Sequence, residues 1–415
     1  MHSPSLLEAK SKAAALVAAI CAAAGTHAWA VEPQSIRFSD GLKLVPTLKM
    51  EQRYDDNIRA TQYDTQSSWV TAVMPTFVLS TESRTSAYAL TYALDNETYA
   101  SSHADDHTDH HVDADAGFQF DVRNRLRLNA GYDKIEDVAN DAYVSSSFGG
   151  TSPGVGNQPV VPQGNSGEPA KYTTTNAGGI YTYGAMDALM QLEMAADYQQ
   201  LRYQNSGGFN DDLEYNSTPL RATGYYRVAP KTRLLAEVRH THYDYLNSSD
   251  QDSDNRALLG GLTWDATART SGTVKIGTEE KSYDNSTFND QNNATWDAGV
   301  QWKPLSYSVF TLNTSQSYQE GNDSAGTISS QTTGLNWAHQ WMERLSSEIS
   351  YSYTDNQYEG SVQHDTIDIV GASLSYEMRR WLDIGVGYKY ATDDSNVDGQ
   401  SYNRNIFSVS FTASL

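Results

Sequence analysis

The sequence predicts an all-β protein, in which one antiparallel, up-and-down β-barrel crosses a membrane. Three observations predict this class. Apolar and polar residues alternate over segments of about ten residues, short turns alternate with long polar loops between these segments, and the last segment runs to the final residue of the sequence. A closed barrel needs a last strand that pairs with the first, because an open sheet edge is not satisfied in lipid.

The clearest alternation lies near the carboxyl end. Alternate residues of a segment form two sets, which we call its two parities. Val370 and Leu374 belong to one parity, and Gly371 and Ser373 belong to the other. Successive side chains of a strand point to opposite faces, so this pattern indicates one face toward lipid and one toward water.

The start of the chain has the features of a secretory signal peptide. Two lysines precede the apolar stretch 13–24, and residues 28–30 form an Ala-x-Ala cleavage site. We therefore expect residues 1–30 to be a removed signal peptide and 31–415 to be the barrel domain. The single cysteine, Cys21, falls in the signal peptide, so we expect a mature chain without disulfides.

About eighteen segments fit membrane strands, with sixteen as the alternative, because short strands are easily merged or split. An even number, with both chain ends on the side of short periplasmic turns, is expected of bacterial outer-membrane barrels with long extracellular loops. The seventh segment also fits a helical pattern, but its neighbours favour a strand. In chain order the segments are 42–54, 69–80, 86–99, 112–122, 125–136, 172–183, 186–203, 219–228, 233–245, 256–265, 271–283, 295–303, 307–318, 330–339, 345–358, 365–377, 382–390 and 407–415.

Composition excludes several other classes. Hydrophobic residues make up 39% of the chain and the mean hydropathy is -0.58. No apolar run is long enough for a membrane helix, whereas barrel strands are compatible with such an average. A formal net charge of -22 argues against nucleic acid as a partner. A soluble propeller or β-helix would show blade or short repeats, which are absent from the sequence.

The polar parity carries charges of both signs and predicts a hydrated interior, because barrels of 16 to 18 strands leave an aqueous channel. No bulky apolar set is expected on this parity to fill the interior. The charges can contact a passing solute, or they can simply pair across the wall. Tyr225 lies between two arginines and suits a sugar ring, although tyrosines are also common in interfacial girdles. The candidate lumen-lining residues are Asp113, Asp115, Arg125, Arg127, Glu193, Arg221, Tyr225, Arg227, Glu237, Arg239, Lys275 and Glu279.

Two connections have unusual compositions. The connection 137–170 is rich in glycine and proline, and it can either fold into the bore or stand outside it. The stretch 103–111 holds four histidines among carboxylates, a composition that can bind Zn²⁺ or Ca²⁺. A hydrophilic external loop is the simpler interpretation of that stretch, and we assign it no metal.

Catalytic motifs are absent from the sequence. The chain has no G-x-S-x-G elbow, and His240 and His242 have no identifiable nucleophile partner. We therefore expect a protein that is not an enzyme and that uses no cofactor.

The amino-terminal strands carry a family resemblance. Pro46, the Tyr-Asp-Asp-Asn-Ile segment at 54–58 and the Val-Met-Pro-Thr-Phe segment at 73–77 resemble the start of the Putative beta-barrel porin 2 family of outer-membrane proteins. The segment at 54–58 is the most specific part. Leu415 departs from the phenylalanine that ends many outer-membrane proteins.

The resemblance implies a conduit for secretion of an exopolysaccharide or capsular polysaccharide. Its expected partners are outer-membrane lipids, the polysaccharide and a periplasmic polysaccharide-export protein. The alternative is a general or sugar-uptake diffusion porin. Polymer identity, transport direction and oligomeric state are left open by the sequence.

Overall fold

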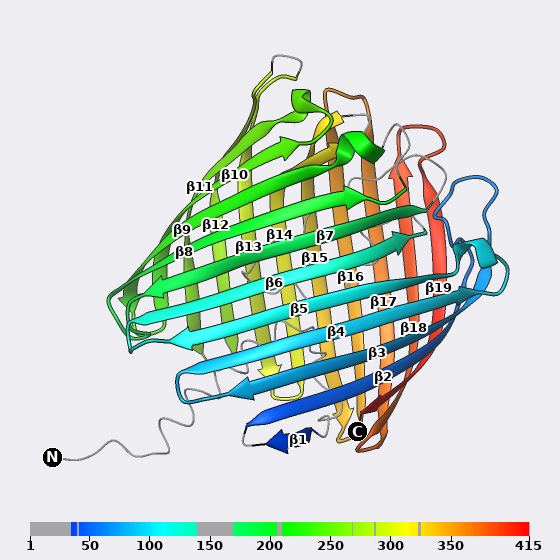
Figure 1. Cartoon of the computed structure of the whole chain (residues 1–415), viewed down its shortest axis with the longest axis horizontal. Helices are drawn as coiled ribbons and strands as arrows, with labels where there is room; N and C mark the ends of the chain where they lie inside the picture. Colours follow the sequence, from blue (N-terminus) through cyan, green and yellow to red (C-terminus); the bar gives the residue numbers. More distant parts are fainter. Residues whose placement is uncertain are drawn as a thin grey trace.

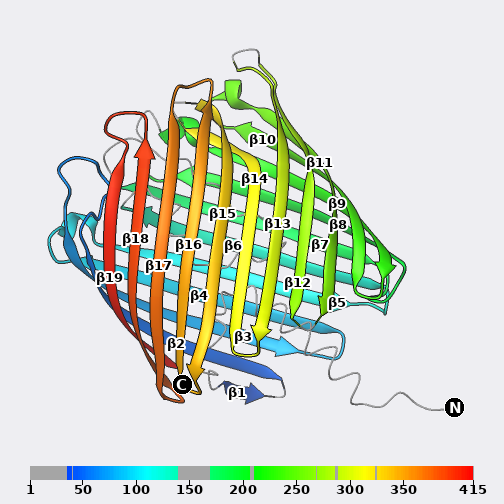
Figure 2. The same ribbon diagram turned by 180° about the vertical axis from the view of Figure 1, so that it is seen from behind.

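The computed structural model describes residues 35–39, 41–138, 169–205, 210–267, 269–285, 288–322 and 325–414. Within them, a nineteen-stranded sheet consists of the short strand β1 and the barrel strands β2 to β19. Every barrel strand pairs antiparallel with the next, and β19 pairs with β2 from Ile406 opposite Asp55 to Ser414 opposite Thr47. Figures 1 and 2 show the two sides of the closed wall. The predicted closed barrel is confirmed, with the larger of the two expected strand numbers.

The connections define two ends of the barrel. We call the end where β3 meets β4 and β15 meets β16 the short-turn end, and the end where β2 meets β3 the long-loop end. The strands are β1 (Ile36–Ser39), β2 (Leu42–Asp55), β3 (Ser68–Glu82), β4 (Ser86–Tyr99), β5 (His107–Gln119), β6 (Asn124–Asp137), β7 (Ala170–Tyr183), β8 (Met190–Tyr203), β9 (Tyr215–Ala229), β10 (Thr232–Tyr245), β11 (Ser253–Thr267), β12 (Thr270–Tyr283), β13 (Gln291–Leu305), β14 (Ser308–Asn322), β15 (Ala325–Met342), β16 (Leu345–Glu359), β17 (His364–Arg379), β18 (Leu382–Ser395) and β19 (Tyr402–Ser414).

Several strands reach further toward the long-loop end than the sequence predicts. Strand β5 begins at His107, five residues before the expected start, and ends at Gln119. Strands β14 and β15 take up most of the expected connection 319–327. Backbone pairing continues beyond the lipid, where side chains are polar, so the apolar alternation marks only part of each strand. Strand β1, which pairs Ile36 with Leu44 of β2, was not predicted.

The outer face of the wall is apolar. Leu220, Ile276 and Val386 are 49%, 64% and 48% exposed. They lie on the parity opposite to Arg221, Lys275 and Lys389 of the same strands. Large apolar side chains spread over a whole barrel surface are stable when lipid covers them. The predicted assignment of the apolar parity to the outside is confirmed.

Aromatic rings gather on this outer face near the short-turn end. The ring centroids of Trp302 and Phe310 are 5.3 Å apart, and those of Phe310 and Trp337 are 5.7 Å apart. The Trp337 indole Nε1 donates to Ser308 Oγ at 2.9 Å. Aromatic rings that carry a polar N–H or O–H group are typical of the level where lipid headgroups begin.

The inner face at the long-loop end is not fully hydrated, which corrects the expectation of an interior without bulky apolar groups. One cluster joins Tyr172, Leu201, Tyr215 and Tyr245 of the wall to Leu213 of the short 3₁₀ helix η2, which spans Asn210–Leu213. Further clusters line β3 and β4, β15 and β16, and β17 to β19. Sequence parity detects which face a residue occupies, but not whether loops cover that face.

The Tyr-Asp-Asp-Asn-Ile segment joins the first barrel strand to the last. Asp55 is 0% exposed and accepts hydrogen bonds from Arg404 Nε at 3.0 Å and Nη2 at 2.6 Å. Asp56 accepts from the backbone N–H of Asn405 at 2.7 Å and from its side-chain Nδ2 at 2.7 Å. Asn57 Nδ2 donates to the carbonyl of Asn403 at 3.0 Å. This segment therefore fixes the seam at which the barrel closes.

The loop that follows the segment is held by the neighbouring loops. Arg59 Nη2 lies 2.9 Å from Asp105 Oδ1, and the Gly399 N–H donates to Gln62 Oε1 at 2.6 Å. Tyr63 Oη donates to Asp398 Oδ1 at 2.7 Å, and this hydrogen bond raises the pKa of Tyr63. The β2–β3 loop is therefore bound to the β4–β5 connection on one side and to the β18–β19 connection on the other.

Asp121 organises the turn between β5 and β6, and we expect a pH-dependent contribution to stability from it. Its carboxylate accepts from the backbone N–H of Arg123 at 2.6 Å and of Asn124 at 2.8 Å, and these bonds lower its pKa. A lowered folded-state pKa stabilises the fold above the unfolded pKa of about 3.9, and this contribution is lost as pH falls through the folded value. Urea unfolding of the wild type and Asp121→Ala should therefore differ at pH 7 and converge toward pH 3. An equal difference at both pH values would contradict this role.

No helix among the described residues is long and apolar enough to cross a membrane, a finding that does not bear on β-barrels. The expected signal peptide 1–30, most of the connection 137–170, and Leu415 lie outside the described residues.

Candidate functional site: the lumen wall

All twelve candidate lumen-lining residues lie on the inner parity of the wall. In β9, for example, Leu220 and Tyr226 are exposed on the outer face, while Arg221, Tyr225 and Arg227 alternate with them in sequence. The same alternation places Asp113 and Asp115 on β5, Arg125 and Arg127 on β6, Glu193 on β8, Glu237 and Arg239 on β10, and Lys275 and Glu279 on β12. Whether they contact a solute stays a prediction.

Many of these charges are paired within the wall. Arg221 Nη2 lies 3.0 Å from Glu193 Oε1 of the neighbouring strand. Glu237 is 3% exposed and accepts from Thr223 Oγ1 at 2.8 Å and from Arg239 Nε at 2.6 Å. These pairs satisfy the charges without a ligand.

The network around Glu237 extends to two further strands. Lys275 Nζ lies 3.3 Å from Glu237 Oε1 and 2.7 Å from Asp297 Oδ2. Arg239 also reaches Asp297, at 3.3 Å. Asp297 was absent from the predicted set, although it occupies the inner parity of the expected strand 295–303. The position of Lys275 directly opposite it was the missing information, because that depends on strand register.

The remaining acidic candidates have different surroundings. Glu279 accepts from Asn255 Nδ2 at 2.8 Å and from the backbone N–H of Tyr318 at 3.1 Å. Asp113 lies opposite Gly131 in the register, and Asp115 lies opposite Asn129. The interior therefore combines fixed ion pairs with carboxylates that accept from neutral donors or lie opposite neutral residues.

A second part of the wall is lined by small polar residues. On β14, Asn313 and Ser315 are exposed on the inner parity, and Ser373 of β17 is exposed likewise. Gly371 pairs with Ser350, and Ser410 pairs with Gly385, across neighbouring strands of the same wall. Hydroxyls, amides and bare backbone present many weak hydrogen-bonding groups and little bulk. The lumen thus has a charged wall on β5–β12 and a small-residue wall on β14–β19.

Sequence comparison decides the family. The family model described as "Putative beta-barrel porin 2" matches residues 42–415, which is the whole barrel from β2 onward.

The chain belongs to this porin family.

The porin is therefore an outer-membrane β-barrel protein, and porins of this kind are typically not enzymes. Several solved structures are similar to it at low sequence identity. Pseudomonas aeruginosa OccK3 (OpdO) is 14% identical, with 89% of this chain and 95% of that chain covered and a TM-score of 0.46. OccK2 (OpdF) from the same organism is 12% identical, with 90% and 98% covered and a TM-score of 0.47. The FrpB iron transporter from Neisseria meningitidis is 11% identical, with 86% and 62% covered and a TM-score of 0.44. No curated protein matches the chain.

The porin also contains buried charge clusters at the long-loop end that sequence reasoning did not identify. Lys281 is 0% exposed and its Nζ lies 2.6 Å from Glu320 Oε1. Tyr245 Oη donates to Glu320 Oε2 at 2.6 Å, and Lys281 Nζ lies 5.1 Å from the centroid of the Tyr243 ring. Glu320 lies beyond the end of the expected strand 307–318, which is why the pair was missed. Tyr243 is therefore a packing residue of the porin wall.

Only the first part of the histidine-rich stretch lies in the loop that the sequence predicts, and residues 107–111 are strand. Only His103–Asp105 form a 3₁₀ helix, and His107 already begins β5. His107 lies 3.9 Å from Glu97, whereas His111 Nδ1 lies 2.8 Å from Asp133 Oδ1. Among the residues that the structure describes, no three histidine, cysteine or acidic side chains form a group that could hold a metal.

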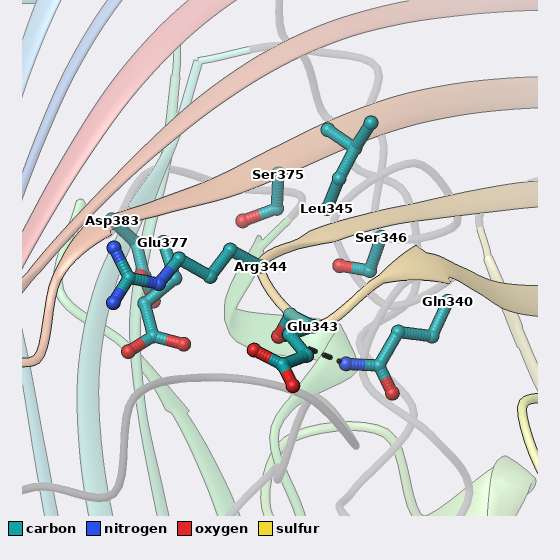
Figure 3. Close-up of a pocket in the computed structure, with 8 residues that line it drawn as sticks. All are labelled: Gln340, Glu343, Arg344, Leu345, Ser346, Ser375, Glu377 and Asp383. Atoms are coloured by element: carbon teal, nitrogen blue, oxygen red, sulfur yellow. Dashed lines mark hydrogen bonds between the residues drawn. The ribbon is translucent and has the colours of Figure 1, made fainter.

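A small polar pocket lies at the short-turn end of the porin, beside the β15–β16 turn (Figure 3). Gln340 Nε2 donates to the carbonyl of Glu343 at 3.1 Å. Figure 3 shows the Arg344 side chain extending toward Glu377 and Asp383. The lining holds no nucleophile–base pair, so we assign the pocket no chemistry.

Proposed function

We propose that this porin is the outer-membrane conduit for secretion of an exopolysaccharide or capsular polysaccharide. The observation that carries the proposal is the small-residue wall, with Asn313, Ser315 and Ser373 exposed to the lumen. A hydrated polymer can exchange hydrogen bonds with such groups one after another, without a strong binding site that would stop it. The family membership supports an outer-membrane location for this step.

The charged wall fits the same task. Several of its charges are held in pairs, such as Arg221 with Glu193 and Lys275 with Asp297. Paired charges keep water in the lumen but attract a passing chain less strongly than free ones would. In this proposal the polymer is driven by its synthesis behind the barrel, and the protein itself needs no cofactor.

The proposal includes two partners besides the membrane lipids. The polysaccharide occupies the lumen, and a periplasmic polysaccharide-export protein delivers it to the short-turn end. The short turns face the periplasm in barrels of this class, so the proposal has delivery at that end.

Deletion of the gene should abolish surface polymer while polymer accumulates in the periplasm. The reason is that a long hydrophilic chain has no other path across the apolar interior of the bilayer. Polymer is measured in surface, periplasmic and cytoplasmic fractions, and a plasmid copy should restore secretion. A deletion strain that keeps normal surface polymer would contradict the proposal.

A general or sugar-uptake diffusion porin is the second candidate. The same small-residue wall would also allow small solutes to pass. Swelling of proteoliposomes in small neutral sugars, together with intact polymer secretion in the deletion strain, would favour this candidate over the first.

A further inference from the structure

Strands β9 and β10 place arginines directly opposite each other on the lumen face, in two pairs. Arg221 faces Arg239, and Arg227 faces Arg233. Like charges directly opposite on neighbouring strands are destabilising. Each pair therefore needs compensation from negative groups, either in the protein or in a ligand.

The protein compensates the first pair. Arg221 lies 3.0 Å from Glu193 Oε1. Arg239 lies 2.6 Å from Glu237 Oε1 and 3.3 Å from Asp297 Oδ2. Three carboxylates thus surround this pair.

The second pair has no such compensation. Arg233 donates to neutral acceptors, Gln191 Oε1 and the Met186 carbonyl. In the part of the chain that the structure describes, neither Arg227 nor Arg233 forms an ion pair with a carboxylate, and Arg227 makes no side-chain hydrogen bond.

A third arginine, Arg125, lies in the same part of the wall as the second pair. We call this part of the wall, next to the β7–β8 turn, the corner. Arg125 Nη2 donates to the Gly184 carbonyl at 3.2 Å, in the same β7–β8 turn that accepts from Arg233. Gln191 also donates to this turn, at the Ala185 carbonyl at 2.5 Å. Arg125 Nε is buried without a hydrogen-bond partner. This corner therefore holds excess positive charge and an unused donor, at the short-turn end of the lumen.

An aromatic side chain completes the corner. Tyr225 lies on the inner face, two residues from Arg227 and directly opposite Gln191 of β8. Within the described residues it has neither a stacked ring nor a hydrogen-bond partner. An aromatic face beside an amide and guanidinium groups matches a sugar ring that carries an acid, because the ring packs on the tyrosine and the carboxylate takes charge-assisted hydrogen bonds.

We propose that Arg125, Arg227, Arg233, Gln191 and Tyr225 form a binding site for a carboxylate-bearing sugar unit at the periplasmic mouth of the lumen. This inference rests on the proposed function for its ligand, and it narrows the transported polymer to an acidic polysaccharide. The site would hold each acidic unit as the chain enters the barrel.

The test measures binding of fluorescently labelled hexagalacturonate to the full-length porin in detergent by fluorescence anisotropy. We expect saturable binding that weakens as NaCl is added, because exposed charges are screened. Unlabelled hexagalacturonate should compete, whereas neutral maltohexaose should not. Sodium sulfate tests whether a small anion alone is sufficient, and it should compete only at much higher concentration.

Variants locate the site. Arg227→Gln combined with Arg233→Gln should weaken binding by about tenfold or more, because charge-assisted bonds are lost. Tyr225→Leu should weaken binding without changing charge. Lys231→Gln, at an exposed residue in the neighbouring turn, is the matched control and should bind like the wild type. If the double variant does not fold, Arg227→Gln alone serves, since this side chain forms no described hydrogen bond.

Several outcomes would overturn the site. These are equal binding by the wild type and the arginine variants, equal competition by maltohexaose, or displacement by sulfate at the same molar concentration, which would indicate a small-anion site. Normal polymer secretion in the deletion strain would instead overturn the conduit and leave the binding result standing. Absence of saturable hexagalacturonate binding would also overturn the site, while export of a neutral polymer would still stand.

Discussion

Replacing Asp55 by alanine is expected to lower the free energy of unfolding of the barrel by about 3–5 kcal/mol, the cost of removing one partner of a buried ion pair. Asp55 and Arg404 are 0% and 8% exposed, and two hydrogen bonds join them across the seam between β2 and β19. The variant removes the carboxylate and leaves the guanidinium buried. Because the seam is where the first and last strands meet, the loss affects closure of the whole barrel.

The effect is measured by urea unfolding, monitored through the gel mobility difference between folded and unfolded barrel. Asp212→Ala is the matched control, since Asp212 is exposed in η2; its unfolding should match that of the wild type within about 0.5 kcal/mol. Equal midpoints for Asp55→Ala and Asp212→Ala would show that the seam pair does not stabilise closure.

Replacing Lys281 by methionine is expected to have a similar effect, again about 3–5 kcal/mol. Lys281 and Glu320 are 0% and 2% exposed and lie 2.6 Å apart. Methionine nearly preserves the volume but leaves the Glu320 carboxylate buried, with the Tyr245 hydroxyl as its remaining described hydrogen-bond donor.

A double-mutant cycle separates the lost pair from lost packing. Lys281→Met combined with Glu320→Gln removes both charges, so much of the lost stability should return. Lys303→Met, at an exposed lysine, controls for the loss of one positive charge. Additive effects of the two substitutions would contradict coupling between Lys281 and Glu320.

The barrel could be predicted from the sequence because the evidence for it, the alternation of apolar and polar residues, is local. Lipid on one face and polar groups on the other impose an alternation that is visible in single segments, such as Val370 to Tyr376. The strand ends at the long-loop end were less accurate, since His107 and Asn322 lie in paired backbone without an apolar parity. There, pairing depends on the neighbouring strand and not on the strand's own side chains.

The sequence could predict which residues face the lumen, but not which of them contact one another. Parity placed Lys275 and Arg227 inside, but it gave no information on which acids they meet, because cross-strand neighbours depend on register. Register pairs Lys275 with Asp297 and Arg227 with Arg233. Because register was not known from the sequence, the difference between the charged wall and the small-residue wall was not predicted. The role of the Tyr-Asp-Asp-Asn-Ile segment at the seam was not predicted for the same reason.

Cysteine labelling at two adjacent positions of β17 tests most directly whether the small-residue face lines a water-filled lumen. The single cysteine, Cys21, lies in the predicted signal peptide, so Ser373→Cys and Leu374→Cys would each introduce one thiol into the mature barrel. In intact outer membranes, a charged, water-soluble maleimide should react with the cysteine at 373 and not with the one at 374. Equal labelling of both, or labelling at 374 alone, would contradict a polar lumen enclosed by an apolar outer face.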